Sequence, residues 1–400
     1  MGEKYDFDRM VDRRNSDSIK WHKYGEDVIP MWVADMDFVS PEPVLRALRT
    51  RVEHGIFGYP DEIYGPLKPV SELRQVIVER MLRLYQWSIQ PDEIVFMPGV
   101  VTAFDLACHA TLTPDQAVLV QTPVYHPILE AAQNTGVRGK QMLLTRESDG
   151  SYSLDLDLFR HSLTPQTKLF LLCNPHNPVG KLFRREELQS MAEICLEHEV
   201  LICSDEIHCD LVFSGQRHVP IASLSPEISN NTITLMAPSK TFNLAGLQCS
   251  FAIIQNRELR KQYLGATKGL VPWVNLMGMT AALAAYRDGE PWLQQLLAYL
   301  ESNRDFLFES LNSRLPAIHM AKPEATYLAW LDCRETDFSE NPYLFFLEKA
   351  RLAFNDGDSF GPGGKGFIRL NFGCPKSILS EAIDRMWEAW QSCQGSSRTD

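Results

Sequence analysis

The sequence predicts an α/β protein with a mostly parallel central sheet and a smaller α+β domain at the C-terminal end. Between residues 93 and 254, short apolar runs alternate with helical patterns, as in parallel strands joined by right-handed crossovers. The runs are apolar along their length, which indicates a sheet that is covered on both faces. After about residue 270 the pattern changes to longer helices with isolated strands.

The individual elements follow from the same patterns. Strands of the central sheet are expected at residues 93–97, 117–121, 168–173, 200–204, 231–236 and 250–254. Helices between them are expected from about residue 100, at 127–134 and at 185–199. Farther on, we expect a helical stretch at 275–312 that breaks at 288–291, strands at 326–332 and 367–372, and helices at 341–353 and 376–392.

These elements divide the chain into three parts. A chain of 400 residues that is 44% hydrophobic can fill two domain cores. We expect an N-terminal arm at residues 1–45, rich in turn signals, that packs on the small domain. A large domain should span residues 46–280, and a small C-terminal domain should span residues 281–400.

The charge and the cysteines limit the classes of protein to which this chain can belong. The net charge of −12 disfavours a nucleic-acid partner, because phosphate backbones require clustered cations. The nine cysteines form no CxxC pair and several sit in apolar runs, so we expect reduced, buried thiols. No apolar run is long enough to span a bilayer and the start lacks a signal-peptide core, which predicts a cytoplasmic protein without membrane contact.

Polar residues follow several of the predicted strands, and ligands of open parallel sheets bind outside the carboxyl ends of the strands. The first strand leads through Gly99 into a helix, and the free N–H groups at Val100 and Val101 can hold a phosphate. Alone this signal is weak, because most such turns bind nothing. In CNPHNPVG (173–180), the amide of Asn177 can donate to a ligand oxygen, although plain turn chemistry explains the motif equally well.

The motif SDEIHCD (204–210) places Asp205 at the end of a buried strand. A carboxylate buried there needs a cationic partner, such as the protonated nitrogen of a pyridine ring. The alternatives are an exposed acidic loop and a metal site that includes His208. We rank the metal site low and expect no metal, because no further His or Cys beyond Cys209 lies at ligand spacing.

Two cationic residues complete the set of candidates. Lys240 follows Ser239 between an apolar strand and a turn of small residues, and a partly desolvated lysine can form a Schiff base. The alternative is a solvated surface lysine. Arg369 lies inside the apolar strand FIRLNF, where its guanidinium suits a substrate carboxylate; an internal salt bridge is the alternative.

Together these motifs resemble the fold-type-I pyridoxal-phosphate enzymes, the aminotransferase class I/II superfamily, over nearly the whole chain. The resemblance implies pyridoxal 5′-phosphate as the cofactor of the large domain. It implies that Asn177 contacts a ring oxygen, that Asp205 pairs with the ring nitrogen, and that Lys240 carries the cofactor. Further implied roles are ring stacking for Tyr125, phosphate binding for Val100, Val101 and Ser239, and α-carboxylate binding for Arg369.

Two departures from the aminotransferase pattern narrow the family. His208, which is expected to contact the cofactor, stands where a Tyr is usual. Gln248 replaces the phosphate-binding Arg, so the phosphate must find other donors. With VADMDF (33–38) and FGYP (57–60), these features resemble the carbon–sulfur β-lyases of the MalY/PatB and cystalysin type. That likeness implies a homodimer with shared active sites, in which Tyr59 reaches the cofactor phosphate of the neighbouring subunit.

The predicted function is therefore a carbon–sulfur β-lyase that cleaves L-cystathionine or a related cysteine S-conjugate to pyruvate, ammonia and a thiol. Lys240, Asp205 and Tyr125 are the expected catalytic residues, with Lys240 as general base. Ala34 is expected to contact the substrate with Arg369 and Asn177. Other candidate lining residues, each equally consistent with a structural role, are Asp35, His126 and Tyr327. The alternatives are an aminotransferase, a regulatory protein with a residual site, and a metal hydrolase using Asp205, His208 and Asp210.

Overall fold

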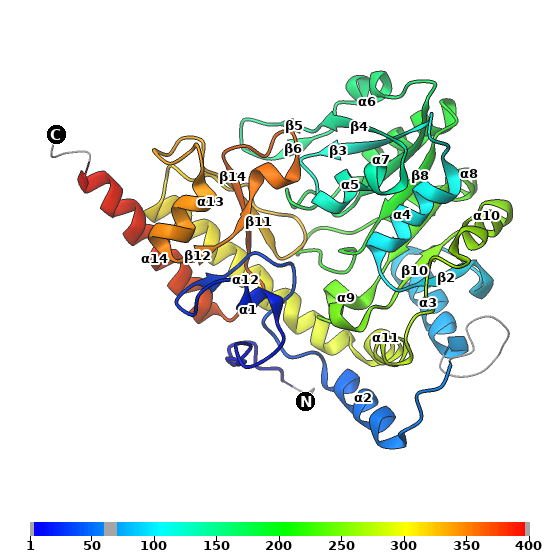
Figure 1. Cartoon of the computed structure of the whole chain (residues 1–400), viewed down its shortest axis with the longest axis horizontal. Helices are drawn as coiled ribbons and strands as arrows, with labels where there is room; N and C mark the ends of the chain where they lie inside the picture. Colours follow the sequence, from blue (N-terminus) through cyan, green and yellow to red (C-terminus); the bar gives the residue numbers. More distant parts are fainter. Residues whose placement is uncertain (1–3, 60–69, 397–400) are drawn as a thin grey trace.

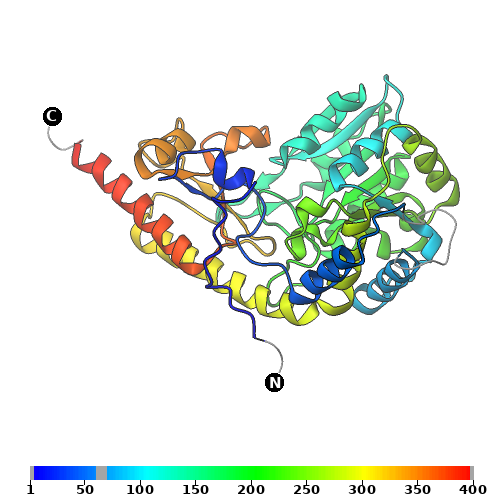
Figure 2. The same cartoon turned by 60° about the horizontal axis from the view of Figure 1, so that its bottom comes forward.

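The computed structural model describes residues 4–59 and 70–396. Its elements form two lobes, which Figures 1 and 2 show on either side of the N-terminal segment (blue). The larger lobe contains the central sheet, and the smaller lobe contains the C-terminal elements. The long helix α12 (Glu290–Arg314, yellow) runs along the base and joins them. No helix in the described part of the chain is both long and apolar enough to cross a membrane.

Seven strands of the described residues form the central sheet, in the order β2-β10-β9-β8-β7-β3-β4. Their bounds are Ile94–Met97 (β2), Ala117–Thr122 (β3), Arg138–Leu143 (β4), Thr167–Cys173 (β7), Leu201–Asp205 (β8), Thr232–Met236 (β9) and Ser250–Ile253 (β10). The predicted mostly parallel sheet is confirmed, and two details differ. β10 runs antiparallel to both neighbours, because the chain after β9 turns back at the same edge instead of crossing over.

The second difference is β4, which the sequence patterns do not predict. This strand lies at the edge of the sheet, and of its six residues only Met142 is buried. An edge strand with one covered side needs no continuous apolar run. Its sequence RGKQML therefore lacks the signal that reveals the inner strands.

Helices cover both faces of the sheet, as the apolar strands predict. In β7, Leu169 and Leu171 pack with one face, while Phe170 and Leu172 pack with the other. The first face is covered by α4 (Val100–Thr111), α5 (His126–Thr135) and α10 (Arg257–Thr267). The second is covered by α6 (Leu156–Ser162), α7 (Arg185–Glu197) and α8 (Pro226–Asn230). The continuous apolar runs are thus explained by burial on both sides.

The smaller lobe is built on a three-stranded sheet in the order β11-β14-β13. Its elements are β11 (Leu328–Asp332), α13 (Pro342–Phe345), a π-helical turn (Phe346–Ala350), β13 (Asn355–Asp356), a 3₁₀ turn (Gly357–Phe360), β14 (Phe367–Asn371) and α14 (Lys376–Ser396). The helix predicted at 341–353 ends early, because Leu352–Ala353 form β12 and pair in parallel with β1 (Ile29–Pro30). That pairing brings the N-terminal segment onto the smaller lobe.

The remaining elements connect these parts. They are α1 (Ile19–His22), α2 (Glu42–His54), α3 (Val70–Tyr85), β5 (Thr145–Arg146), β6 (Tyr152–Ser153), α9 (Pro238–Thr241), α11 (Leu276–Asp288) and one-turn 3₁₀ helices at Pro91–Glu93, Ile221–Ser223 and Ala245–Leu247. Gly289 ends α11 and precedes α12, where the break was predicted. The boundary expected near residue 280 falls inside α11, and the three-part division stays a prediction.

Candidate active site

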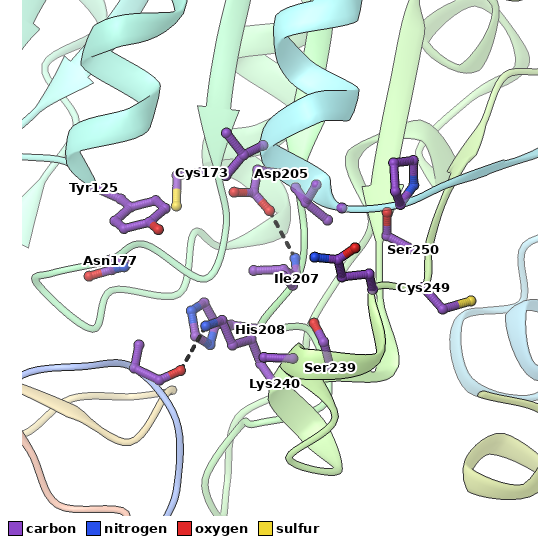
Figure 3. Close-up of a pocket in the computed structure, with 17 residues that line it drawn as sticks. Tyr125, Cys173, Asn177, Asp205, Ile207, His208, Ser239, Lys240, Cys249 and Ser250 are labelled. Carbon is purple, nitrogen blue, oxygen red and sulfur yellow. Dashed lines mark hydrogen bonds between the residues drawn. The ribbon is translucent and has the colours of Figure 1, made fainter. Parts of the chain in front are cut away.

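The polar residues that follow the parallel strands lie together at the carboxyl ends of those strands. β7, β8 and β9 are neighbours, with Cys173 opposite Asp205 and Asp205 opposite Leu235. The segments that follow these strands therefore meet, and they line a cavity of about 150 Å³ (Figure 3). Of the residues predicted from sequence, those that line it are Ala34, Val100, Val101, Tyr125, Asn177, Asp205, His208, Ser239, Lys240 and Gln248.

Lys240 directs its amine into this cavity. It belongs to the four-residue turn α9, and its Nζ donates a 2.7 Å hydrogen bond to the carbonyl of Ala34. Burial, together with the charge of Arg369, lowers the pKa of Lys240 to about 8. The amine is therefore closer to its neutral, nucleophilic form than a surface lysine is, and the solvated-lysine alternative is wrong.

Asp205 is buried at the end of β8. Its Oδ1 accepts a 3.1 Å hydrogen bond from the backbone N–H of Ile207, drawn as a dashed line in Figure 3. Burial raises the pKa of this carboxyl to about 7, because a charge in an apolar surrounding is costly. The exposed-loop alternative is wrong, and a cation in the cavity would favour the ionised form.

His208 is buried and neutral. Burial, with the nearby charges of Lys240 and Arg369, lowers its pKa to about 3. Its Nδ1 is buried and has no hydrogen-bond partner among the described residues. Buried polar atoms are rarely left unpaired, so this nitrogen fits a site that binds a polar ligand.

Arg369 reaches the site from β14 of the smaller lobe. Its Nη1 donates to Asn177 Oδ1 at 2.9 Å, and its Nη2 donates to the carbonyl of Trp32 at 2.8 Å and to Asn355 Oδ1 at 2.6 Å. None of the ion pairs found in the described residues includes Arg369, so the internal salt bridge considered above is wrong. Burial lowers its pKa to about 10, and its Nε is buried without a partner. An anion would satisfy this guanidinium.

Asn177 and Tyr125 are held together by the backbone. The N–H of Tyr125 donates to the carbonyl of Asn177 at 3.0 Å, and Figure 3 shows both side chains on one side of the cavity. Because Asn177 Oδ1 already accepts from Arg369, its amide nitrogen is the group left to donate to a ligand. Burial raises the pKa of Tyr125, so its phenol stays protonated near neutral pH.

The other end of the cavity offers neutral hydrogen-bond donors. α4 begins at Val100 directly after Gly99, and the residues of its first turn, whose N–H groups have no partner within the helix, line the cavity. Ser239 and the exposed Gln248 line the same cavity. This arrangement suits a phosphate, which helix N-termini and hydroxyl groups bind.

Tyr59 lies outside the cavity. Its side chain is 91% exposed, and its ring contacts Trp273 edge-on at 5.4 Å between centroids. Phe57, Tyr59 and residues 271–277 line a separate, open hollow. The part of the FGYP motif that follows Tyr59 lies outside the described residues.

The N-terminal segment reaches the site, where Ala34 lines the cavity as expected, through hydrogen bonds that the sequence does not reveal. The carbonyl of Ala34 accepts from Tyr327 as well as from Lys240, and Asn371 Nδ2 donates to the carbonyls of Val33 and Asp35. These residues are far apart in the chain and share no pattern. The Asp35 carboxylate itself pairs with Arg13, and the exposed His126 begins α5 outside the cavity lining.

The residues of the metal alternative, Asp205, His208 and Asp210, do not form a ligand group in the structure. Asp210 does not face Asp205 and His208 but pairs with Arg80. Across residues 4–59 and 70–396, no group of three His, Cys, Asp or Glu side chains is placed to hold a metal ion.

Comparisons with known proteins agree with this geometry. The model of the family "Aminotransferase class I and II" matches residues 28–386. "Cystathionine beta-lyase PatB" of Bacillus subtilis (strain 168) is 40% identical over 388 residues, which cover 95% of this chain and 98% of the relative. The crystal structure of OvoB has a TM-score of 0.91 and 42% identity, covering 97% of this chain and all of that chain. The PLP-bound C–S lyase from Staphylococcus hominis has a TM-score of 0.90 and 34% identity, covering 96% and 99%.

Proposed function

Because the chain belongs to the aminotransferase class I and II family, we propose that it is a pyridoxal-phosphate-dependent carbon–sulfur β-lyase. It cleaves L-cystathionine or a related cysteine S-conjugate to pyruvate, ammonia and a thiol. The observation that carries the proposal is the meeting of Lys240, Asp205 and Asn177 at one cavity, with Arg369 hydrogen-bonded to Asn177. Its relatives include a cystathionine β-lyase and a C–S lyase that match over nearly their whole length.

The residues present fit pyridoxal 5′-phosphate. Asp205 is a buried carboxylate that needs a cationic partner, which the protonated ring nitrogen provides. The unpartnered His208 Nδ1 and Arg369 Nε indicate that the site is built for further polar groups. Lys240 supplies the amine that holds the cofactor carbonyl, and Tyr125 supplies an aromatic face. The start of α4 with Ser239 and Gln248 supplies phosphate donors.

When bound, pyridoxal 5′-phosphate supplies an electron-accepting ring that stabilises negative charge developing at the substrate Cα. Arg369 holds the substrate carboxylate by charge-assisted hydrogen bonds, and Asn177 keeps the guanidinium in place. Holding the substrate at its carboxylate and at a second point orients its Cα–H bond. Part of the binding energy is thereby used to position the reacting atoms.

Lys240 then accepts the proton from Cα, for which a pKa of about 8 suits it near neutral pH. Asp205 holds the proton on the ring nitrogen throughout, because the ion pair relieves the cost of its burial. The Cβ–S bond breaks and the thiolate leaves. Hydrolysis of the remaining three-carbon fragment gives pyruvate and ammonia.

We also propose a homodimer in a reducing compartment, the cytoplasm. Phe57, Tyr59 and Trp273 expose large aromatic surfaces, and Val101 and Gln248, which line the cavity, are exposed too. A second copy would cover this face and bring Tyr59 to its neighbour's phosphate. All nine cysteines are free, and eight of them are buried, which suits a reducing environment.

The decisive assay supplies the cofactor-loaded protein with L-cystathionine and no 2-oxo acid. Continuous, equal release of pyruvate and ammonia supports β-elimination. If products appear only after a 2-oxo acid is added, the protein is an aminotransferase and the lyase proposal fails. If neither L-cystathionine nor L-cysteine releases pyruvate and ammonia, with or without a 2-oxo acid, the protein cleaves neither substrate. Measuring the molecular mass of the holoenzyme in solution, for the wild type and for Tyr59→Ala, tests the dimer.

A further inference from the structure

A buried ion pair lies behind the turn that carries Lys240. Arg80 Nη2 donates to Asp210 Oδ1 at 2.5 Å, and both side chains are less than 5% exposed. The second oxygen of this carboxylate accepts a 3.0 Å hydrogen bond from the hydroxyl of Thr241. Thr241 is fully buried and directly follows Lys240 in the chain.

This hydrogen bond joins the two segments that carry the chemistry. Asp210 lies with His208 in the short segment that follows Asp205, the last residue of β8. Thr241 is the last residue of α9, which also contains Lys240. The acid expected at the ring nitrogen and the lysine expected at the cofactor carbonyl are therefore linked through Asp210 and Thr241.

The turn α9 depends on such an anchor. It has only four residues, and a single helical turn gains too few hydrogen bonds to be stable alone. The anchor itself is rigid, because Arg80 lies on the sixteen-residue helix α3 and its guanidinium lies over the ring of Tyr286 at 4.9 Å. The Arg80 Nη1 also lies 3.7 Å from a carboxylate oxygen of Glu290 at the start of α12.

We propose that Thr241 is a positioning residue, whose hydroxyl bond to the Arg80–Asp210 pair fixes Lys240 relative to Asp205. The inference rests on the proposed roles of Lys240 and Asp205. Loss of the bond lets α9 turn, which displaces the amine from the Cα proton. The substrate carboxylate stays bound, because Arg369 lies on β14 and is untouched. The effect therefore falls on kcat and not on KM.

The test compares Thr241→Val with Thr241→Ser in the holoenzyme. Valine has nearly the same shape but no hydroxyl, and serine restores the hydroxyl. Thr234→Val is the matched control, because Thr234 is a buried threonine of β9 whose hydroxyl has no hydrogen-bond partner. We measure kcat and KM for L-cystathionine, the melting temperature, and the pH midpoint of the absorption band of the bound cofactor.

Thr241→Val should lower kcat roughly 10- to 100-fold with KM within about twofold, since small displacements of a reacting group cost this much. It should also move the pH midpoint of the absorption band, while Thr241→Ser and Thr234→Val match the wild type. The proposal is overturned if Thr241→Val keeps the wild-type kcat and spectrum. It is also overturned if Thr234→Val lowers kcat as much as Thr241→Val does. If the valine variant does not fold, Thr241→Ala against Thr241→Ser makes the same comparison.

A failure of the lyase assignment is distinguishable from a failure of this inference. If the wild type releases no pyruvate, the proposed activity is wrong, and the absorption midpoints of the variants still test the positioning of Lys240. If the wild type is an active lyase and Thr241→Val behaves like it, only the positioning role is wrong.

Discussion

Replacing Asp205 by Asn should stabilise the cofactor-free protein. The carboxyl is buried, and its pKa in the folded protein is raised to about 7 by that burial. In the unfolded chain its pKa returns to the ordinary value of 3.8. The folded state therefore holds the proton more tightly, and the stability that this group contributes is lost as the pH rises from about 4 to about 7. Asparagine cannot ionise and avoids the loss, and its Oδ1 can still accept from Ile207.

The size of the effect follows from the two pKa values. The difference between about 7 and 3.8 corresponds to about 4 kcal/mol at pH 8, since one pKa unit is about 1.4 kcal/mol. At pH 5.5 only the unfolded chain is ionised, and the same relation gives about 2 kcal/mol. The advantage of Asp205→Asn should thus roughly double between pH 5.5 and pH 8.

Urea titration of the apoprotein at several pH values measures this advantage. Asp332→Asn is a control for which the opposite change in stability is expected. Hydrogen bonds from Arg334 outweigh the effect of burial and lower the pKa of Asp332. That variant should be less stable than the wild type, by an amount that is constant above the ordinary aspartate pKa of 3.8 and shrinks as the pH falls below it. Loading with cofactor should remove the stability advantage of Asp205→Asn. The protonated ring nitrogen forms an ion pair with aspartate but not with asparagine.

An Asp205→Asn apoprotein that is no more stable than the wild type at pH 8 would refute the reasoning. So would an advantage that does not depend on pH. Either result would mean that Asp205 already has a compensating partner in the free protein.

Three further outcomes are expected. Lys240→Ala should lower turnover by roughly 10²- to 10⁴-fold or more, because the general base is lost together with the cofactor anchor; normal turnover contradicts the assignment. Arg369→Ala should raise KM for L-cystathionine roughly 10- to 100-fold, since a hydrogen bond to a charged group contributes about 1.5–3 kcal/mol; an unchanged kcat/KM contradicts carboxylate binding. The rate at which the apoprotein takes up pyridoxal 5′-phosphate should rise with pH and level off above about 8, the pKa of Lys240; a rise that continues towards pH 10 would mean that the lysine is not buried.

Much of the sheet is predictable because strands buried on both faces have continuous apolar sequences. The polar residues after those strands are then placed together by topology, which is how Asp205, Asn177 and Lys240 can be identified before the structure. The edge strand β4 and the reversed strand β10 escape this reasoning. The first is mostly solvent-exposed, and the direction of the second depends on a connection that leaves no local pattern.

The partners of the predicted residues are harder to foresee. Asn355 and the carbonyl of Trp32 contact Arg369, and Asp210 contacts Thr241, across chain separations that no periodicity encodes. Backbone carbonyls carry no residue signature at all, so the contact of Ala34 with Lys240 cannot be read from the residue types. Residue type reveals which side chains carry chemistry, and only the folded chain reveals what holds them.

The pairing of β1 with β12 has a consequence for the order of assembly. Residue 29 leaves the ribosome long before its partner at residue 352, and the carbonyls of Trp32 and Ala34 likewise await Arg369 and Tyr327. The central sheet, complete by residue 253, has all of its strands available while synthesis continues. A chain interrupted near residue 300 would therefore contain the lysine and the acid but have no closed substrate site. Closure of that site is a late event of biosynthesis, set by contacts between residues 293 to 337 positions apart in the chain.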